Sequence, residues 1–223
     1  INIKFNKRFS KMKAEKFVKN IIYKKINPKL IFVSNNFKFG NKRKGNIKLL
    51  KSLSKKYHYK LKKVNPFRHK GIISSTRIRK LLQKGKIDLA NKLLSRTWFI
   101  DGVIIQGRKL GRKLGYRTCN IYIKNYILPK IGIYAVKILI EKERKKYDGV
   151  SYLGSRPTFK GKKIYLETYI FGLKKNLYKK KLKIYFLKFI RGDKKFNNRE
   201  ELINQMNKDV IFAKKGLKTK LIL

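Results

Sequence analysis

Helical and strand-like patterns of hydrophobic residues alternate along the first 95 positions of the chain. Apolar residues recur at helical spacing in KAEKFVKNII (13–22), and a short apolar run of strand length, KLIFVS, follows at 29–34. The same order continues in patterns for a helix, a strand and two further helices: 46–56, 59–64, 75–85 and 87–95. Because helices and strands alternate, this half of the chain is predicted to be an α/β domain with a parallel sheet.

The pattern changes at Thr97, where β-branched and aromatic residues become dominant. Six segments have the composition of strands and are separated by glycine, proline or charged turns: 97–107, 120–127, 132–141, 147–154, 163–171 and 182–190. Short strands at this spacing predict a small antiparallel barrel or a sandwich. We therefore expect two domains, residues 1–95 and 96–223, with the boundary near residue 96.

A helix is expected to close the chain at about 198–215. Asn198 is a candidate N-cap, and Glu201 stands three residues further on, as in a capping box. The apolar stripe of this helix has four members at helical spacing: Leu202, Met206, Val210 and Ala213.

Composition supports a folded protein in a reducing compartment. Of the 223 residues, 42% are hydrophobic and 13% are aromatic, which argues against disorder. Cys119 is the one cysteine, so no disulfide can form within the chain, and a cytoplasmic setting is expected. No apolar run approaches the ~20 residues of a membrane helix, and no signal-peptide pattern is present at the start, which is Ile1 rather than methionine.

The net charge of +51 is the outlying property, with 62 Lys and Arg against 11 Asp and Glu. One interpretation is a nucleic-acid-binding protein held by phosphate contacts. The other is a lysine-rich chain from an AT-rich genome, and we favour it because the lysines are spread over every segment. Non-specific affinity for nucleic acid is expected under either interpretation, and the protein is expected to be a monomer.

The stretch GRKLGRKLGYRTCN (107–120) is the first candidate for chemistry. It matches neither a Walker A loop nor a dinucleotide-binding fingerprint. Three evenly spaced glycines leave backbone N–H groups free to face phosphate oxygens, and four cations stand among them: Gly107, Gly111 and Gly115, with Arg108, Lys109, Arg112 and Lys113. Thr118 and Asn120 would point to one side of an extended segment, where their oxygens suit Mg²⁺. A basic turn between two strands is the open alternative.

Glu167 is the second candidate, because acids are scarce and this one lies inside a predicted strand. By period-two alternation, its face of the strand KIYLETYIF is otherwise aromatic, with Tyr165, Tyr169 and Phe171. A carboxylate among aromatic rings suits a general base beside a flat substrate. A solvent-facing glutamate paired with a lysine is the alternative, and the pattern alone favours it.

These motifs together resemble a known family. GRKLGRKLGYRTCN is similar to the Gly-Arg-x-x-Gly-x-Pro-Thr-Ala-Asn signature of riboflavin kinases. Further segments follow in the order of the bacterial bifunctional riboflavin kinase/FMN adenylyltransferases: ISSTRIRKLL (73–82), GIYAV (132–136), GSRPTF (154–159), YLETYIF (165–171) and LYKKKLKIYFLKFIRGDKKF (177–196). The resemblance covers nearly all of residues 5–214. It implies a partial Rossmann-like nucleotidyltransferase domain, then a small antiparallel β-barrel kinase domain with a C-terminal helix.

The resemblance implies that the second domain phosphorylates riboflavin to FMN with ATP and Mg²⁺. Residues matching the family's ATP-phosphate ligands are Gly107, Arg108, Gly111, Arg112 and Gly115. Thr118 and Asn120 match its metal ligands, Glu167 its catalytic carboxylate, and Arg191 an arginine near its flavin site. Two departures put full activity in doubt: Arg117 stands where the family has proline, and Cys119 where it has alanine.

The resemblance implies a phosphate-binding motif for the adenylyltransferase half at Ser74, Ser75, Thr76, Arg77 and Arg79. The family also has a His-x-Gly-His-type motif, and neither His58 nor His69 lies in one. In VSNNFKFG (33–40), Ser34 and Asn36 replace a glycine and an aspartate of the family. We therefore expect no FAD synthesis from these 223 residues, because of either a truncated product or a decayed gene. A basic RNA-binding or ribosome-associated protein and a degenerate pseudo-enzyme are the alternatives to an active kinase.

Overall fold

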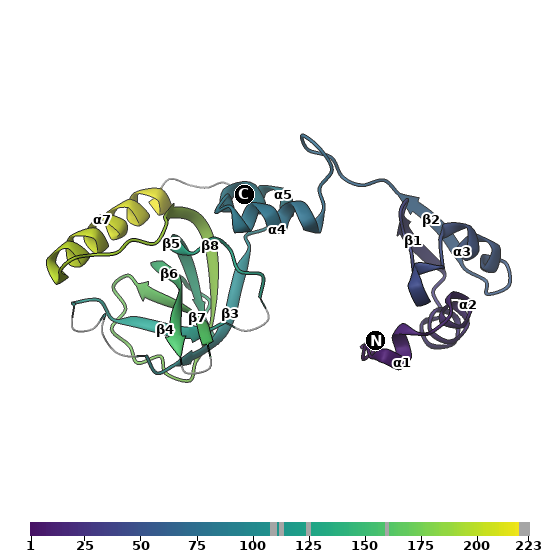
Figure 1. The fold of residues 1–223 in the computed structure, drawn as a ribbon, viewed down its shortest axis with the longest axis horizontal. Helices are drawn as coiled ribbons and strands as arrows, with labels where there is room; N and C mark the ends of the chain where they lie inside the picture. Colours follow the sequence, from purple (N-terminus) through teal and green to yellow (C-terminus); the bar gives the residue numbers. More distant parts are fainter. Residues whose placement is uncertain (108–110, 112–113, 124–125, 159–160, 219–223) are drawn as a thin grey trace. The chain divides into compact units, whose positions relative to one another are not determined.

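The computed structural model describes residues 1–107, 111, 114–123, 126–158 and 161–218. Two compact units divide the chain, Ile1–Ile72 and Ile73–Leu223 (Figure 1). The two units correspond to the two textures of the sequence, although their boundary differs from the expected one.

The first unit contains a two-stranded parallel sheet with helices. Its elements are α1 (Lys7–Ser10), α2 (Ala14–Phe17), the π-helix η1 (Val18–Ile26), β1 (Leu30–Ser34), the 3-10 helix η2 (Asn41–Arg43), α3 (Ile47–Ser54) and β2 (Lys60–Val64). Strands β1 and β2 pair in parallel, as the alternating pattern predicts. Val18 and Leu50 are fully buried at the centre of this unit. The pattern missed α1 and η2, which are too short to show a hydrophobic period.

The second unit is a closed barrel with helices at its side. Its elements are α4 (Ser75–Gln83), α5 (Ile87–Leu94), β3 (Phe99–Ile105), β4 (Thr118–Tyr122), β5 (Gly132–Ile140), β6 (Lys146–Thr158), β7 (Gly161–Ile170), β8 (Lys181–Arg191) and α7 (Arg199–Lys218). The strands close in the order β3-β4-β7-β6-β5-β8, and all pairs are antiparallel. The expected antiparallel architecture is confirmed, and of its two forms the barrel is the one observed.

Alternation along the strands decides which side chains fill the barrel and which face outward. Ile121, Leu153 and Leu166 are at most 1% exposed and lie in the barrel core. Their chain neighbours Asn120 and Glu167 are cross-strand partners and therefore lie on the outer face of the sheet. Helix α7 packs against the barrel at β5, β6 and β8 (Figure 1).

The compact units divide between Ile72 and Ile73, whereas the sequence predicts a domain boundary near residue 96. The difference is the helical pair α4 and α5, whose apolar residues belong to the barrel's core cluster. The buried Asn91 amide donates to the Phe186 carbonyl at 2.8 Å and accepts from the Trp98 N–H at 2.7 Å. These bonds join α5 to β8, so the two helices pack as part of the barrel unit.

The N-terminal cap of the last helix is the one that the sequence predicts. The Asn198 side chain accepts a hydrogen bond from the Glu201 N–H at 2.8 Å, and the Glu201 carboxylate accepts one from the Asn197 N–H at 3.2 Å. The first bond satisfies an N–H group in the first turn of the helix, and the second ties the preceding segment to that turn. Helix α7 thus begins at Arg199, as the capping pattern predicts.

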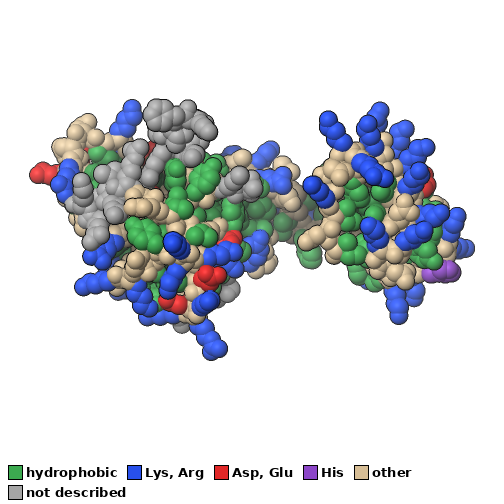
Figure 2. All heavy atoms as spheres, turned by 90° about the horizontal axis from the view of Figure 1, so that it is seen from below, with side chains coloured by type: hydrophobic (Ala, Val, Ile, Leu, Met, Phe, Trp, Pro, Cys, Tyr) green, Lys and Arg blue, Asp and Glu red, His purple; other side chains and the backbone are tan. Residues whose placement is uncertain are grey.

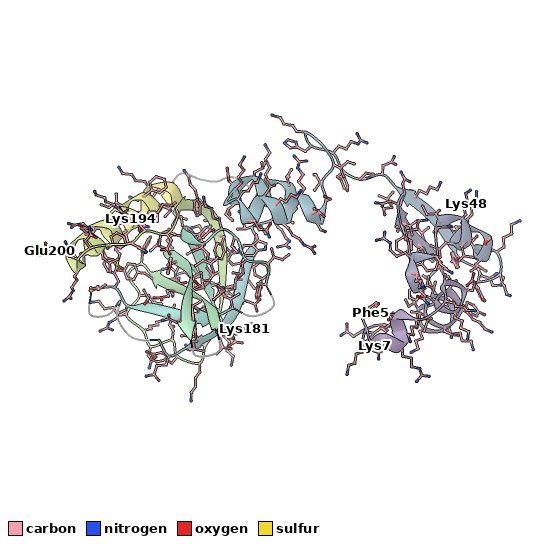
Figure 3. All side chains as sticks on the ribbon, viewed as in Figure 1. Phe5, Lys7, Lys48, Lys181, Lys194 and Glu200 are labelled. Carbon is pink, nitrogen blue, oxygen red and sulfur yellow. The ribbon has the colours of Figure 1, made fainter. Side chains whose placement is uncertain are left out.

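Basic side chains are dispersed over the face of the molecule that Figure 2 shows. On the face that Figure 2 shows, Lys and Arg lie around small hydrophobic areas on both units, with few acids among them. Lys48 in the first unit and Lys181 in the second both extend from the ribbon in Figure 3. None of the helices that the structure describes combines the length and hydropathy that crossing a bilayer requires.

Candidate functional site

The proposed catalytic and metal residues come together on the outer face of the barrel. Glu167 on β7 is paired across the sheet with Asn120 on β4 and with Tyr152 on β6. Thr118 is paired with Tyr169, two positions along the same face. Period-two alternation, which predicts this face from the sequence, thus places a carboxylate, an amide, a hydroxyl and aromatic rings side by side.

A cavity of about 340 Å³ lies over this face, and we call it the aromatic cavity. Its floor includes Glu167, and the rings of Tyr116, Tyr152, Tyr169 and Phe196 form much of its wall. Apolar side chains of α7 complete it: Leu202, Met206 and Val210. Four further charged residues line it: Arg191, Asp193, Lys194 and Asp209. A cavity with several aromatic rings and a carboxylate on the sheet face suits a flat ring system that carries a reactive hydroxyl group.

A second cavity, of about 270 Å³, lies at one end of the barrel, and we call it the basic cavity. Arg117, Lys174 and Lys175 line it together with apolar barrel residues such as Leu177. Thr118 lines both cavities. The two cavities therefore adjoin at Thr118. Arg117, Lys174 and Lys175 line one of them, and Glu167 lies among aromatic rings in the other.

The evenly spaced glycines allow the backbone to approach the proposed metal ligands closely. A Cβ atom on Gly107 would lie 2.3 Å from the Asn120 Nδ2, and one on Gly111 would lie 2.9 Å from the Thr118 Oγ1. A side chain at either position would therefore displace Asn120 or Thr118. Gly115 has a φ of +85°, a backbone conformation that glycine favours in turns. The proposed phosphate ligands Arg108 and Arg112, with Lys109 and Lys113, lie outside the described residues.

The donor atoms of Thr118 and Asn120 fit Mg²⁺ chemically. Both offer neutral oxygens, and Mg²⁺ commonly takes one or two protein oxygens while phosphates and water complete its shell. Asn120 is only 5% exposed beneath Gly107, so Thr118 is the more accessible of the two. Among the described residues, no three His, Cys, Asp or Glu side chains form a group that could hold a metal ion.

Arg191, proposed to bind flavin, lines the aromatic cavity but is engaged by a carboxylate of α7. Its Nε and Nη2 donate to the Asp209 carboxylate at 2.9 and 2.7 Å, and its Nη1 donates to the Gly192 carbonyl at 3.0 Å. Asp209 is 4% exposed and also accepts from the Gln205 side chain at 3.0 Å. The arrangement holds α7 against the barrel, so Arg191 supports the shape of the cavity.

The two departures from the family signature lie on the side of the basic cavity. Arg117 is exposed and adds a cation to this cavity. The Cys119 thiol lies 3.3 Å from the Thr168 carbonyl, and burial raises the pKa of Cys119 to about 12. The thiol therefore stays protonated at neutral pH and is a poor nucleophile.

The proposed phosphate motif of the adenylyltransferase half lies at the start of α4, in the barrel unit. Ser74, Ser75 and Arg79 line an open cavity of about 380 Å³, whereas Thr76 and Arg77 are not among its lining residues. The Ser74 hydroxyl accepts from the Arg77 N–H at 3.2 Å and caps the helix. In the first unit, the Ser34 hydroxyl donates to the Asn36 side chain at 2.9 Å within the proposed flavin-side loop.

Several residues of the two cavities were not predicted from the sequence. The residues of α7 that line the aromatic cavity were assigned only to a buried stripe, because the pattern does not show what an apolar face packs against. Lys174 and Lys175 lie in a turn that carries no motif among many lysines. Tyr169 was placed on the face of Glu167, and that alternation was the signal that found it.

The barrel, the glycine-rich loop and the two adjoining cavities define an enzyme of the riboflavin kinase class. Residues 94–217 match the family model "Flavokinase: Riboflavin kinase", and residues 1–77 match "FAD_syn: FAD synthetase". The chain belongs to the family of bifunctional riboflavin kinase/FMN adenylyltransferases. The two matched regions leave α4 after its first turn and most of α5 unassigned, which is where the structural and expected boundaries differ. The division into residues 1–95 and 96–223 stays a prediction.

Relatives in the family are similar over nearly the whole chain. The bifunctional riboflavin kinase/FMN adenylyltransferase of Buchnera aphidicola subsp. Schizaphis graminum is 42% identical, covering 96% of this chain and 69% of the relative. The Escherichia coli K12 enzyme is 30% identical over 95% of this chain and 68% of its own length. A crystal structure described as a macrolide-efflux protein from Streptococcus pneumoniae has a TM-score of 0.79 at 29% identity, covering 92% of this chain and 66% of that one. The chain thus spans about two thirds of the length of these proteins.

Proposed function

We propose that this chain transfers the γ-phosphoryl group of ATP to the terminal ribityl hydroxyl of riboflavin, producing FMN and ADP. One observation carries the proposal: a cation-lined cavity and an aromatic cavity that contains Glu167 adjoin at Thr118. ATP phosphates suit the first cavity and a flavin ring the second. The names of the family's members support the same pair of substrates.

In this proposal, positioning and charge supply most of the catalysis. The aromatic cavity holds the flavin ring so that the ribityl chain extends along the outer face toward Thr118. Glu167 accepts the proton of the terminal hydroxyl as its oxygen forms a bond to the γ-phosphorus. The bond from that phosphorus to the β–γ bridging oxygen breaks, and ADP leaves with the electron pair. Arg117, Lys174 and Lys175 offset the negative charge of the nucleotide phosphates.

Mg²⁺ would neutralise phosphate charge when bound, and Thr118 with Asn120 would hold it. Gly107 and Gly111 contribute by leaving room for the loop to lie directly over those two side chains. The glycine loop is therefore proposed to cover the nucleotide phosphates while it braces the metal ligands.

We expect FMN without FAD from these 223 residues. The chain contains no His-x-Gly-His motif, and the FAD synthetase model matches only residues 1–77. Formation of FAD from FMN and ATP by this chain would contradict the expectation. It would leave the kinase proposal intact, since the two reactions use different parts of the chain.

A kinase assay tests the proposal. Purified protein is incubated with riboflavin, ATP and Mg²⁺, the flavins are separated by chromatography, and Glu167→Gln is compared with wild type. Loss of the general base is expected to slow FMN formation by about 10²–10⁴-fold. Glu141→Gln, which changes an exposed carboxylate on the same barrel, is expected to react as wild type. If the wild type formed no FMN, the proposed reaction would be wrong. If Glu167→Gln formed FMN at an undiminished rate, the proposed role of Glu167 would be wrong.

We also propose that the chain acts as a monomer in the cytoplasm and binds nucleic acid only non-specifically. Support comes from the single free cysteine and from lysines dispersed over both units. Non-specific binding predicts a steep loss of RNA affinity with salt and no effect of Glu167→Gln on it. Sequence-selective RNA binding that persists at high salt would favour the alternative of an RNA-binding protein.

A further inference from the structure

The glycine-rich loop and helix α7 are joined by one hydrogen bond at the rim of the aromatic cavity. The Tyr116 hydroxyl donates to the Asn207 side-chain oxygen, although the two residues stand 91 positions apart in the chain. Tyr116 closes the loop and Asn207 lies on the exposed side of α7. The bond therefore connects two walls of the cavity that the sequence does not connect.

Tyr116 has two further contacts besides this bond, one through its ring and one through its backbone. Its edge packs against the Tyr169 ring, with centroids 5.1 Å apart and an interplanar angle of 84°. Its backbone N–H donates to the Gly111 carbonyl at 2.8 Å, which fixes the turn that carries it. Both rings line the aromatic cavity, so the orientation of Tyr116 sets part of the width available to a ligand.

Helix α7 is itself fixed to the barrel on its other side. Arg191 and Asp209 join it to the end of β8, and Met206, next to Asn207, lines the cavity. Asn207 thus offers the loop an acceptor on a firmly anchored helix. A phenol that bonds to a rigid helix loses less freedom when a ligand binds beside it than an unattached one would.

We propose that the Tyr116–Asn207 bond is a latch that sets how tightly the aromatic cavity holds its flat ring ligand. The proposal rests on the proposed function for the identity of that ligand, riboflavin. When the bond is formed, the Tyr116 ring packs against Tyr169 and completes one wall of the aromatic cavity. With the bond broken, the loop end and α7 separate more readily, and the ligand dissociates faster.

The phenol is suited to act as the donor. Burial, with Tyr169 and Asp209 as further causes, raises the pKa of Tyr116, so the hydroxyl keeps its proton at neutral pH. Because the bond lies at the rim, water can partly replace it, and its loss is expected to weaken binding only moderately.

Four variants test the latch. Riboflavin binding is followed by quenching of flavin fluorescence, and activity by steady-state kinetics. Tyr116→Phe removes the donor and Asn207→Ala the acceptor. Each is expected to raise the Kd and the KM for riboflavin about three- to tenfold, with the KM for ATP unchanged. Asn207→Asp keeps an acceptor oxygen and is expected to retain a Kd close to that of wild type. The double variant Tyr116→Phe/Asn207→Ala should bind no more weakly than the singles.

Asn204→Ala is the matched control, because Asn204 is exposed on the same helix and lines neither cavity. It is expected to bind riboflavin as wild type does. The latch would be overturned if Tyr116→Phe or Asn207→Ala bound riboflavin as tightly as wild type, or if the two effects were additive in the double variant. FMN formation by the wild type would still support the kinase proposal in that case. A wild-type protein that neither binds nor phosphorylates riboflavin would instead overturn the proposed function.

Discussion

The two cavities that adjoin at Thr118 differ in how they are built. The basic cavity is formed by the end of the barrel and the turn after β7, and its charged groups are exposed cations. The aromatic cavity is enclosed by a sheet face, a loop and a helix that come from separate parts of the chain. An anionic phosphate needs only nearby charge, whereas a rigid ring needs surfaces of matching shape. Changes that loosen packing should therefore affect the aromatic cavity more than the basic one.

Thr118 belongs to both cavities, and its loss is expected to have the largest effect. Thr118→Val keeps the shape but removes the hydroxyl, so a proposed Mg²⁺ ligand and a polar group at the junction are lost. We expect kcat for FMN formation to fall by about 10²-fold and the Mg²⁺ requirement to rise. Both are measured by titrating Mg²⁺ in the kinase assay. Thr97→Val, outside both cavities, is the control, and equal effects of the two substitutions would contradict a special role for Thr118.

Breaking the ion pair that anchors α7 should affect the aromatic cavity more than the basic cavity. Asp209→Asn leaves Arg191 beside a neutral amide, and lost charge-assisted bonds of this kind cost about 2 kcal/mol of unfolding free energy. Because α7 walls only the aromatic cavity, the KM for riboflavin should rise more than the KM for ATP. Urea denaturation and steady-state kinetics measure the two effects.

The control for Asp209→Asn is Glu200→Gln, an exposed acid near the start of the same helix (Figure 3). It should lower stability far less than Asp209→Asn does, through the helix dipole alone, and should change neither KM. If Asp209→Asn raised both KM values equally, α7 would serve the whole site, and the contrast between the cavities would be wrong.

Removing a charge from the basic cavity should change the KM for ATP rather than the KM for riboflavin. Lys174→Ala removes one exposed cation, and such contacts contribute roughly 0.2–1 kcal/mol in water. We therefore expect a KM for ATP raised about two- to fivefold, less so at high salt, with the KM for riboflavin unchanged. Lys180→Ala, an exposed lysine that lines neither cavity, should leave both KM values unchanged. A salt-independent effect would argue against a simple phosphate contact.

The smallest effect is expected from an ion pair outside both cavities. Asp101 accepts from the Tyr126 hydroxyl at 2.5 Å and pairs with Lys181 at 2.9 Å, and the Tyr126 bond followed by Lys181 lowers the pKa of Asp101. Its stabilisation is thus present above the unfolded pKa of about 3.9 and is lost as the pH falls through the lower folded value. Asp101→Asn should be less stable than wild type at pH 6, with a difference that shrinks below pH 4. Thermal unfolding against pH measures this, and both KM values should stay unchanged.

Period two in the strands and helical spacing in α7 were enough to predict the barrel elements and the face that carries Glu167. The boundary was harder to predict, because α4 and α5 have ordinary amphipathic patterns, and a pattern does not name the surface on which it packs. Arg191 illustrates the same limit at the site. The family resemblance implies that it lies near the flavin, which stays a prediction. Its bond to Asp209, 18 residues away on another element, had no signal in the sequence. Long-range partners of this kind follow from the tertiary fold and leave no local signal.

Barrel closure has a consequence for the order in which the enzyme becomes competent during synthesis. Strand β3 pairs with β4 and also with β8, the last strand of the barrel. The barrel therefore closes only after the chain has been synthesised through Arg191. Helix α7 comes later still and supplies Met206 and Asp209. A nascent chain can therefore form strand pairs, such as β5 with β6, well before it can hold a flavin. The chain therefore becomes able to bind flavin late in translation, when contacts form between residues that are far apart in the sequence.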